Sequence, residues 1–227
     1  MNCKLCGASI SGELLIKDIL VFKPITSAQI CSACWNSFER ITGVNVCCYC
    51  GREQADTSAC ADCVRWEAQT GEAVLTNRPL FKYNETMQRF MEVYKFQGDY
   101  QLRLAMRDCF SQHLRQNKRA VFVPIPMSNQ HRGFNQVTAL IKQQSQVVDL
   151  LELIPDTRIV PQSHKNRAER MNSEQPFKVR ANLIPKIMNK NVVLIDDVYT
   201  TGRTLHHAFN LISSYTEHTV SSMTLAR

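Results

Sequence analysis

The spacing of apolar residues predicts two consecutive helices near the middle of the chain. The first runs from Glu85 to Phe96, and Gly98 ends it. The second runs from about Tyr100 to Leu114, with Cys109 expected in the core. In the first helix the apolar residues recur at the intervals of a single helix face, namely Met87, Phe90, Met91 and Tyr94. Both helices are therefore expected to cover a hydrophobic core.

Beyond residue 118, short apolar runs alternate with helical patterns. Such alternation is typical of an α/β fold with a mostly parallel sheet flanked by helices. The three runs expected as strands are Ala120–Pro126, Asn191–Ile195 and His218–Leu225. The two intervening helices are expected at Phe134–Leu151 and Thr204–Ser214.

The other segments are interpreted as connections. Residues 64–80 are expected to form a linker, and Ser128–Gly133 and Gln162–Phe177 are expected to form polar loops. The chain is accordingly divided into a small unit, residues 1–66, and an α/β unit, residues 67–227. No apolar run approaches the ~20 residues that span a bilayer, and the N-terminus lacks the apolar core of a secretory signal. A cytoplasmic protein without a transmembrane segment is expected.

Cysteine is the compositional anomaly, because nine of the ten cysteines lie within the first 63 residues. Eight of them form four C-x-x-C pairs, and Gly7 and Gly51 follow two of these pairs at positions where the chain turns back. Without an export signal, this concentration favours metal binding over disulfides. Four such pairs are typical of two structural Cys₄ zinc sites. The expected ligands are Cys3, Cys6, Cys31, Cys34, Cys47, Cys50, Cys60 and Cys63.

The sequence leaves some details of these sites open. Sequential sharing would give the first four cysteines to one ion and the last four to the other, whereas an interleaved arrangement would mix them. Cys47 and Cys48 are both available, and Cys47 is chosen because it restores the two-residue spacing. Cys48 is then a spare thiol. A reduced thiol cluster, a redox pair or an iron–sulfur site are the competing interpretations, with redox sensing as the corresponding function.

The net charge of +7 is unevenly distributed. Residues 1–70 hold six basic and seven acidic side chains, whereas residues 71–227 hold 21 basic and 13 acidic ones. The basic character therefore belongs to the α/β part of the chain. Such a balance suits an anionic partner such as a phosphate compound or nucleic acid, and it also fits a merely solvated basic surface.

The strongest chemical motif runs from Val192 to Thr204. An apolar strand leads to the paired carboxylates Asp196 and Asp197, and then to a turn rich in hydroxyls that contains Gly202. Backbone N–H groups in such a turn, at the start of a helix, can bind a phosphate group. The acids lie where they could accept hydrogen bonds from sugar hydroxyls or bind Mg²⁺. A capped junction with surface acids is the simpler alternative.

This motif resembles the phosphoribosyl pyrophosphate (PRPP) motif of type I phosphoribosyltransferases. Other segments extend the resemblance to the ComF/GntX family over essentially the whole chain, including its double zinc ribbon at the N-terminus. These segments are Lys95-Phe96-x-Gly98-Asp99, Pro124–Pro126, Arg132–Gln136, Gln162-Ser163, Arg167–Asn172 and Leu225–Arg227.

The resemblance implies a phosphoribosyltransferase fold and specific roles. Asp196 and Asp197 would bind the ribose hydroxyls and serve as catalytic residues, with Mg²⁺ bound alongside PRPP. The 5′-phosphate would be held by Thr200, Thr201, Gly202, Arg203 and Thr204. Arg132 would belong to the pyrophosphate loop, and Lys165, Arg167 and Arg170 to a loop that closes over the site.

Two functions from different classes follow from this resemblance. The first is transfer of a phosphoribosyl group from PRPP to an unknown acceptor, in a competence protein needed for natural transformation and DNA uptake. The second is a non-catalytic zinc-ribbon adaptor that binds single-stranded DNA or other competence and DNA-processing proteins at the inner membrane.

Overall fold

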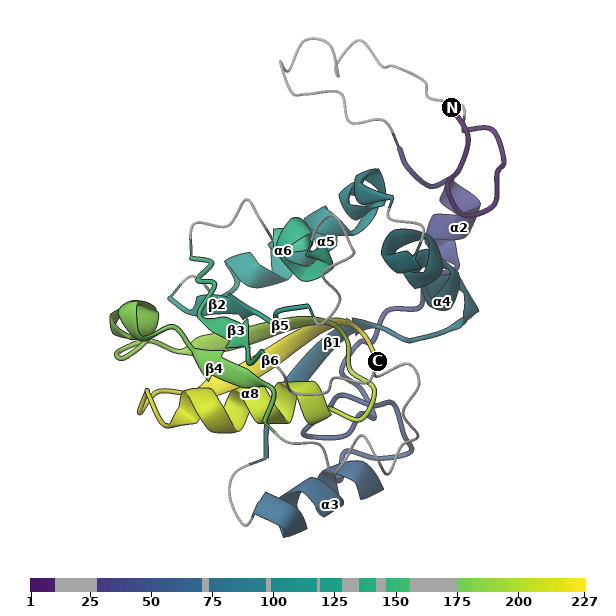
Figure 1. Cartoon of the computed structure of the whole chain (residues 1–227). Coiled ribbons are helices and arrows are strands. Elements are labelled where there is room, and N and C mark those ends of the chain that lie inside the picture. Colours follow the sequence, from purple (N-terminus) through teal and green to yellow (C-terminus); the bar gives the residue numbers. More distant parts are fainter. Residues whose placement is uncertain are drawn as a thin grey trace.

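A four-stranded parallel sheet lies at the centre of the molecule (Figure 1). The computed structural model describes residues 1–10, 28–70, 74–96, 99–117, 119–127, 135–141, 146–155 and 175–227. The strand order is β1-β6-β5-β2, and all three neighbouring pairs are parallel. The strands are β1 (Asn77–Phe81), β6 (Val220–Ala226), β5 (Val192–Val198) and β2 (Val121–Pro124).

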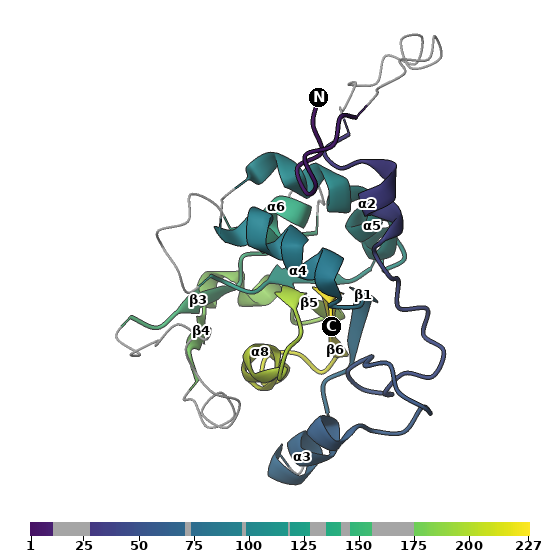
Figure 2. The ribbon, with the colours of Figure 1, turned by 90° about the vertical axis from the view of Figure 1, so that its right-hand side faces the viewer.

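Helices cover both faces of this sheet (Figures 1 and 2). One face carries α4 (Glu85–Met91), which continues into a π-helical turn, η1 (Glu92–Phe96). The same face carries the short 3₁₀ turn η2 (Tyr100–Leu102), α5 (Arg103–Arg115) and α6 (Gln136–Ile141). The opposite face carries α8 (Arg203–Ser213), with the antiparallel pair β3 (Leu151–Leu153) and β4 (Phe177–Val179) beside it. A 3₁₀ segment, η4 (Ala181–Lys186), precedes β5.

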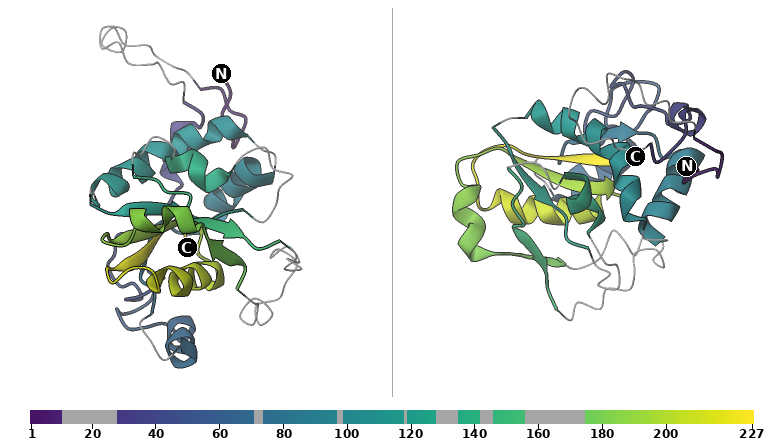
Figure 3. Two further views of the ribbon diagram at one scale, coloured as in Figure 1. Left: turned by 60° about the vertical axis from the view of Figure 1, so that its left-hand side comes forward. Right: turned by 90° about the horizontal axis from the view of Figure 1, so that it is seen from above.

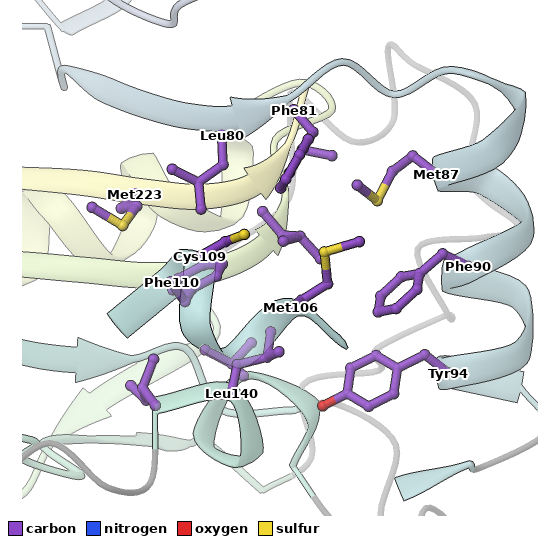
Figure 4. Packing of buried hydrophobic residues seen from close by; sticks show 14 of the residues in the cluster. Leu80, Phe81, Met87, Phe90, Tyr94, Met106, Cys109, Phe110, Leu140 and Met223 are labelled. Carbon is purple, nitrogen blue, oxygen red and sulfur yellow. The ribbon is translucent and has the colours of Figure 1, made fainter. Parts of the chain in front are cut away.

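Alternate residues of the sheet enter two separate cores, as expected for parallel strands buried on both faces. Val193 and Ile195 of β5 join the core under α4, α5 and α6, which Figure 4 shows from close by. Val192 and Leu194 of the same strand join the core under α8. The apolar face predicted for the first helix is the one that is buried, since Met87, Phe90, Met91 and Tyr94 are at most 2% exposed.

Side-chain capping interactions mark the start of α4 and α6. The Asn84 side chain accepts a hydrogen bond from the Met87 N–H and starts α4. The Asn135 side chain accepts one from the Thr138 N–H at the start of α6. The Tyr94 hydroxyl donates to the Gln136 carbonyl oxygen at 2.8 Å, which ties η1 to α6.

The cysteine-rich region reaches both faces of the sheet. Its helix α2 (Ser32–Asn36) lies beside α4, whereas α3 (Ala61–Thr70) lies beyond α8 on the other side (Figures 1 and 3). Packing agrees with this placement, because Cys3 belongs to the core under α4 and Cys63 belongs to the core under α8. The two halves of this region are therefore separated by the sheet.

The structure confirms the predicted fold class and most of the predicted elements. Three predictions about segments are wrong. Residues 64–80 are not a simple linker, because they contain most of α3 and the beginning of β1. The helix predicted over Phe134–Leu151 does not extend to Leu151, because Val147 forms a parallel bridge with Phe122 and Leu151 begins β3. Phe177, assigned to a loop, begins β4.

In the part of the chain that the structure describes, none of the helices combines the length and the apolar character needed to cross a membrane.

Candidate functional site

The paired carboxylates lie at the carboxyl end of the central strand β5. Asp196 and Asp197 are within β5 itself, where the strand pairs with β6. The Asp197 N–H donates to the Asp196 side chain at 2.9 Å. The carboxyl end of a parallel strand is where open α/β sheets bind ligands. This position therefore suits two acids that act on a ligand.

The two carboxylates have different electrostatic surroundings. Asp197 forms an ion pair with Lys95 of η1, with 2.6 Å between the Lys95 Nζ and the Asp197 Oδ2. Removal from water, and then the negative charge of Asp197, raise the pKa of Asp196 to about 7, while Lys95 acts in the opposite direction. The two carboxylates therefore differ, because Asp197 is paired with a cation and the pKa of Asp196 lies near neutrality. The sequence predicts no role for the Lys95 side chain, although Lys95 lies in a segment of the family resemblance.

The turn after β5 has the backbone geometry that its glycine suggests. Gly202 has a φ of +78° and immediately precedes α8. A Cβ atom at this position would lie 2.1 Å from the Tyr199 hydroxyl, so only glycine fits over that ring. Tyr199 is 3% exposed, and its ring lies against Gly202. The turn leads directly into the N-terminus of an 11-residue helix, where the helix dipole favours an anion.

The five residues predicted to bind the phosphate are consecutive in this turn. Thr200 is exposed, Thr201 and Gly202 are buried, and Arg203 and Thr204 are half-buried in the first turn of α8. The Arg203 Nε lies 2.7 Å from the His207 Nε2. The pKa of the Arg203 guanidinium is lowered by burial.

Two side chains distant in sequence contact this turn. The Trp66 Nε1–H donates to the Thr201 carbonyl oxygen at 2.9 Å. Arg227 donates through its Nη1 to the carbonyl oxygens of Tyr199 and Thr200, each at 2.9 Å. The sequence predicts no contact with the turn for either residue, although Arg227 lies in a segment of the family resemblance, because only the fold brings them together.

His206 is part of the same packing, although no pattern in the sequence predicts a buried position for it. It is 2% exposed, and its ring stacks on Trp66 with 4.2 Å between the ring centroids. Burial, followed by the charges of Arg203 and His207, lowers the pKa of His206 to about 4. His206 is therefore neutral at physiological pH.

The cysteine side chains form two groups of four, in the sequential arrangement. Cys3, Cys6, Cys31 and Cys34 form the first cysteine group, and Cys47, Cys50, Cys60 and Cys63 form the second. Within each group all four Sγ atoms lie within 4.8 Å of one another. Cys48 belongs to neither group and is exposed, and Cys109 is buried in the core as predicted.

The sulfur geometry fits a tetrahedral metal ion. Two Sγ–Sγ distances within the first group measure 3.8 and 3.7 Å, and two within the second group measure 3.7 and 3.6 Å. A tetrahedral zinc ion with bonds of about 2.3 Å requires sulfur atoms about 3.8 Å apart, whereas a disulfide requires about 2.05 Å. Backbone N–H groups also point at the sulfurs, as the Cys31 N–H does at the Cys3 Sγ and the Cys60 N–H at the Cys47 Sγ. The donor set therefore suits structural Zn²⁺.

The second cysteine group is attached to the edge of the sheet. The Asn77 N–H in β1 donates to the Tyr49 carbonyl oxygen at 2.7 Å. Gly51, with a φ of +70°, packs so closely on Pro79 of β1 that a Cβ would lie 2.4 Å from the proline Cδ. Gly7, in the matching position of the first group, has a φ of +76° and no atom within 4 Å of such a Cβ.

A cleft of about 460 Å³ opens beside the turn, next to Thr200 and Arg227. Its wall includes Lys82, which is paired with Glu39 and Glu53, and Arg52, which is paired with Asp62. These cations of the cleft are therefore already neutralised by protein carboxylates.

Four predicted site residues lie outside the described residues: Arg132, Lys165, Arg167 and Arg170. The structure brings together the carboxylates, the turn and the cysteine groups, and the roles of these four stay predictions.

Comparison with known proteins gives the family. The chain is 35% identical over 231 residues to the competence protein ComFC of Streptococcus pneumoniae, and the match covers all of both chains. The chain belongs to the ComF family. It is also 33% identical to ComFC of Bacillus subtilis, over 99% of this chain and 94% of the relative. Competence protein F of Haemophilus influenzae is 26% identical over 89% of this chain and 92% of its own. No family model matches the chain.

Membership of the ComF family agrees with the predicted resemblance. The similarity to the two ComFC proteins covers both cysteine groups and the acid-turn segment, since it extends over at least 99% of this chain. The features described above therefore lie within the aligned part of this ComF protein.

Proposed function

We propose that this ComF protein binds PRPP at the carboxyl end of β5 and transfers its phosphoribosyl group to an acceptor, releasing pyrophosphate. The observation that carries the proposal is the placement of Asp196 and Asp197 immediately before a glycine turn that opens α8. A diol-binding acid pair and an anion-binding helix start, a few residues apart, match the two ends of a ribose 5-phosphate.

The residues have separate roles in this proposal. Asp196 and Asp197 accept hydrogen bonds from the ribose 2′ and 3′ hydroxyls. The 5′-phosphate is held by Thr200, Thr201, Gly202, Arg203 and Thr204. Lys95 is the ion-pair partner of Asp197 in the free protein. Arg132, Lys165, Arg167 and Arg170 are proposed to face the pyrophosphate.

Mg²⁺ is proposed to enter with PRPP. The carboxylate oxygens of Asp196 and Asp197 are the ligands that this ion prefers, and the bound ion would neutralise charge on the pyrophosphate oxygens. In the reaction, the bond between ribose C1 and the pyrophosphate oxygen breaks while the acceptor forms a bond to C1. The protein fixes the ribose by both ends, so that C1 is oriented toward the acceptor.

We further propose that each cysteine group holds a structural Zn²⁺ ion. The sulfur separations support this assignment, because they equal the edge of a zinc tetrathiolate. The division into units at residues 1–66 and 67–227 stays a prediction, which expression of residues 67–227 alone would test.

The biological role is proposed from the relatives, which are named competence proteins. A role in natural transformation, in the cytoplasm and alongside the proteins that take up and process DNA, is consistent with those names. The excess of basic residues after residue 71 supports an anionic partner.

Calorimetric titration with PRPP and Mg²⁺ tests the proposed ligand. At pH 8 we expect saturable binding to the wild type and a loss of at least tenfold in affinity for Asp196→Asn and Asp197→Asn, since each replaces a carboxylate whose hydrogen bonds are worth about 1.5–3 kcal/mol. Asp108→Asn is the matched control, because the Asp108 side chain is 85% exposed on α5. Equal binding by all four proteins would contradict the assignment of the site.

The second candidate is a non-catalytic adaptor that binds single-stranded DNA or other competence proteins. The basic α/β part and the relatives' names favour it. A transformation assay in cells carrying Asp196→Asn/Asp197→Asn separates the two. Loss of transformation with normal protein levels supports the transferase, and full transformation supports the adaptor.

A further inference from the structure

Side chains donate hydrogen bonds to three consecutive carbonyl groups of the proposed phosphate turn. Arg227 binds the carbonyl oxygens of Tyr199 and Thr200, and Trp66 binds that of Thr201. These three hydrogen bonds are accepted by successive residues of the backbone. They fix the orientation of three peptide planes in a row.

The orientation matters because a trans peptide group directs its C=O and its N–H to opposite sides. With the carbonyl of Tyr199 held by Arg227, the N–H of Thr200 points away from Arg227. In the same way the N–H groups of Thr201 and Gly202 point away from Arg227 and Trp66. The two side chains thus preorganise three donors toward the side on which the proposed 5′-phosphate binds.

Both side chains are joined to the second cysteine group. Trp66 follows Cys63 by three residues in α3, is 3% exposed, and is held in place by its stacking on His206. Arg227 lies over the Tyr199 ring at 4.3 Å. Tyr199 belongs to the same buried core as the four cysteines of the second group.

Arg227 has more hydrogen-bonding capacity than the described residues satisfy. Its Nε and Nη2 atoms are buried and have no hydrogen-bond partner there. A guanidinium with two buried nitrogen atoms is stabilised by a nearby negative charge. Four thiolates around a divalent metal ion carry a net charge of about −2, so the second cysteine group supplies that charge when it holds its ion.

We propose that Trp66 and Arg227 are positioning residues through which the second cysteine group shapes the phosphate-binding turn. This inference rests on the proposed function and deepens it, since it assigns two residues that touch neither the ligand nor the metal. The first cysteine group, on the opposite side of the sheet, has no such connection to the turn among the described residues.

Ribose 5-phosphate is the sharpest probe, because it reports on the phosphate turn without the pyrophosphate. Trp66→Phe removes the indole donor and keeps an aromatic ring against His206. We expect it to weaken binding of ribose 5-phosphate about threefold to tenfold, the range expected for one hydrogen bond. Trp35→Phe is the matched control, because Trp35 lies in α2 beside the first cysteine group and is the other of the two tryptophans. It should bind within about twofold of the wild type.

A spectroscopic readout separates positioning from simple packing. In the Trp35→Phe protein, Trp66 gives the single indole N–H resonance in a ¹H–¹⁵N spectrum. That resonance should shift as ribose 5-phosphate is added, because its acceptor peptide adjoins the phosphate. An indole resonance that stays fixed through saturation would overturn the proposal, as would wild-type affinity in Trp66→Phe.

Arg227→Lys provides a second variant if Trp66→Phe unfolds. Lysine keeps the positive charge but lacks the planar guanidinium, which lies over the Tyr199 ring and so holds Nη1 against both carbonyl oxygens. Reduced affinity with normal zinc content supports the proposal, and unchanged affinity contradicts it. Failure of the wild type itself to bind ribose 5-phosphate would instead overturn the proposed function, together with the inference that rests on it.

Discussion

Each of the two cysteine groups consists of two C-x-x-C pairs, yet the groups are built into the protein differently. All four cysteines of the second group are buried, whereas Cys6 in the first group is exposed and Cys31 and Cys34 are partly so. The first group packs on α4 at one face of the sheet, and the second is bonded to β1 and, through Trp66, to the turn after β5. A repeated sequence motif therefore does not imply a repeated role.

The largest difference is expected when one ligand is removed from each group. Cys63→Ser should lower the free energy of unfolding by about 4 kcal/mol or more, because it removes a buried metal site at the junction of α3, β1 and the turn. Cys34→Ser should cost about 1–2 kcal/mol, since its group is half exposed. Urea unfolding and zinc analysis of both variants provide the measurement.

Each variant should also lose one of two zinc ions. Equal destabilisation by the two substitutions would show that the groups are structurally equivalent, contrary to the comparison.

The glycines after the two cysteine pairs give the next largest effect. Gly51→Ala should destabilise the protein by about 2–4 kcal/mol, because positive φ is combined with a clash against Pro79. Gly7→Ala has the same kind of backbone and open space around its Cβ, so about 1 kcal/mol is expected. Thermal unfolding measures both. A Gly51→Ala protein as stable as Gly7→Ala would contradict close docking of the second group on β1.

The site beside the second group should show a distinct pH dependence through Asp196. Its folded pKa of about 7 lies above the usual 3.8, so the folded protein holds a proton that the unfolded chain has lost. The resulting stabilisation is full below pH 3.8 and is lost as the pH rises through about 7. At pH 8 we expect Asp196→Asn to be more stable than the wild type by about 1–3 kcal/mol.

The measurement is chemical unfolding at pH 5 and pH 8, with Asp108→Asn as the exposed control. A stability difference between Asp196→Asn and the wild type that is the same at both pH values would argue against an unfavourable charge at this position.

His206, which stacks on Trp66, should give the smallest effect and the opposite sign. Its folded pKa of about 4 lies below the usual 6.5, so its contribution is present above pH 6.5 and is lost as the pH falls toward 4. We expect about 1–2 kcal/mol of this loss by pH 5, and His206→Phe should abolish it. Acid unfolding curves test this, with exposed His218→Gln as the control that leaves the curve unchanged.

Local patterns were sufficient to predict much of this molecule from its sequence. The helix face of α4, the apolar strand β5 and the C-x-x-C pairs are all encoded within a few residues. The strand β1 was missed because Asn77–Phe81 contains a proline and an exposed arginine, and it is a strand because β6 pairs with it. The predicted helix to Leu151 failed because Val147 and Leu151 extend beside other strands, which no helical period reveals.

The acids and the turn of the candidate site were named from the sequence and their role in binding stays a proposal, whereas the residues that support them were not predicted. Lys95, Trp66 and Arg227 reach the site from three separate parts of the chain. Nothing in the sequence around them indicates that meeting, because it is created by the order of the strands and by the docking of α3.

Phosphorus NMR of PRPP in the presence of Mg²⁺ and the protein tests the central claim most directly, because the 5′-phosphate and the pyrophosphate give separate signals. The turn between β5 and α8 predicts that the 5′-phosphate signal shifts or broadens with wild-type protein. It also predicts that this change is lost in Gly202→Val, where a side chain would meet Tyr199. A 5′-phosphate signal unaffected by the wild type, or affected equally by Gly202→Val, would contradict the claim that this turn binds the phosphate.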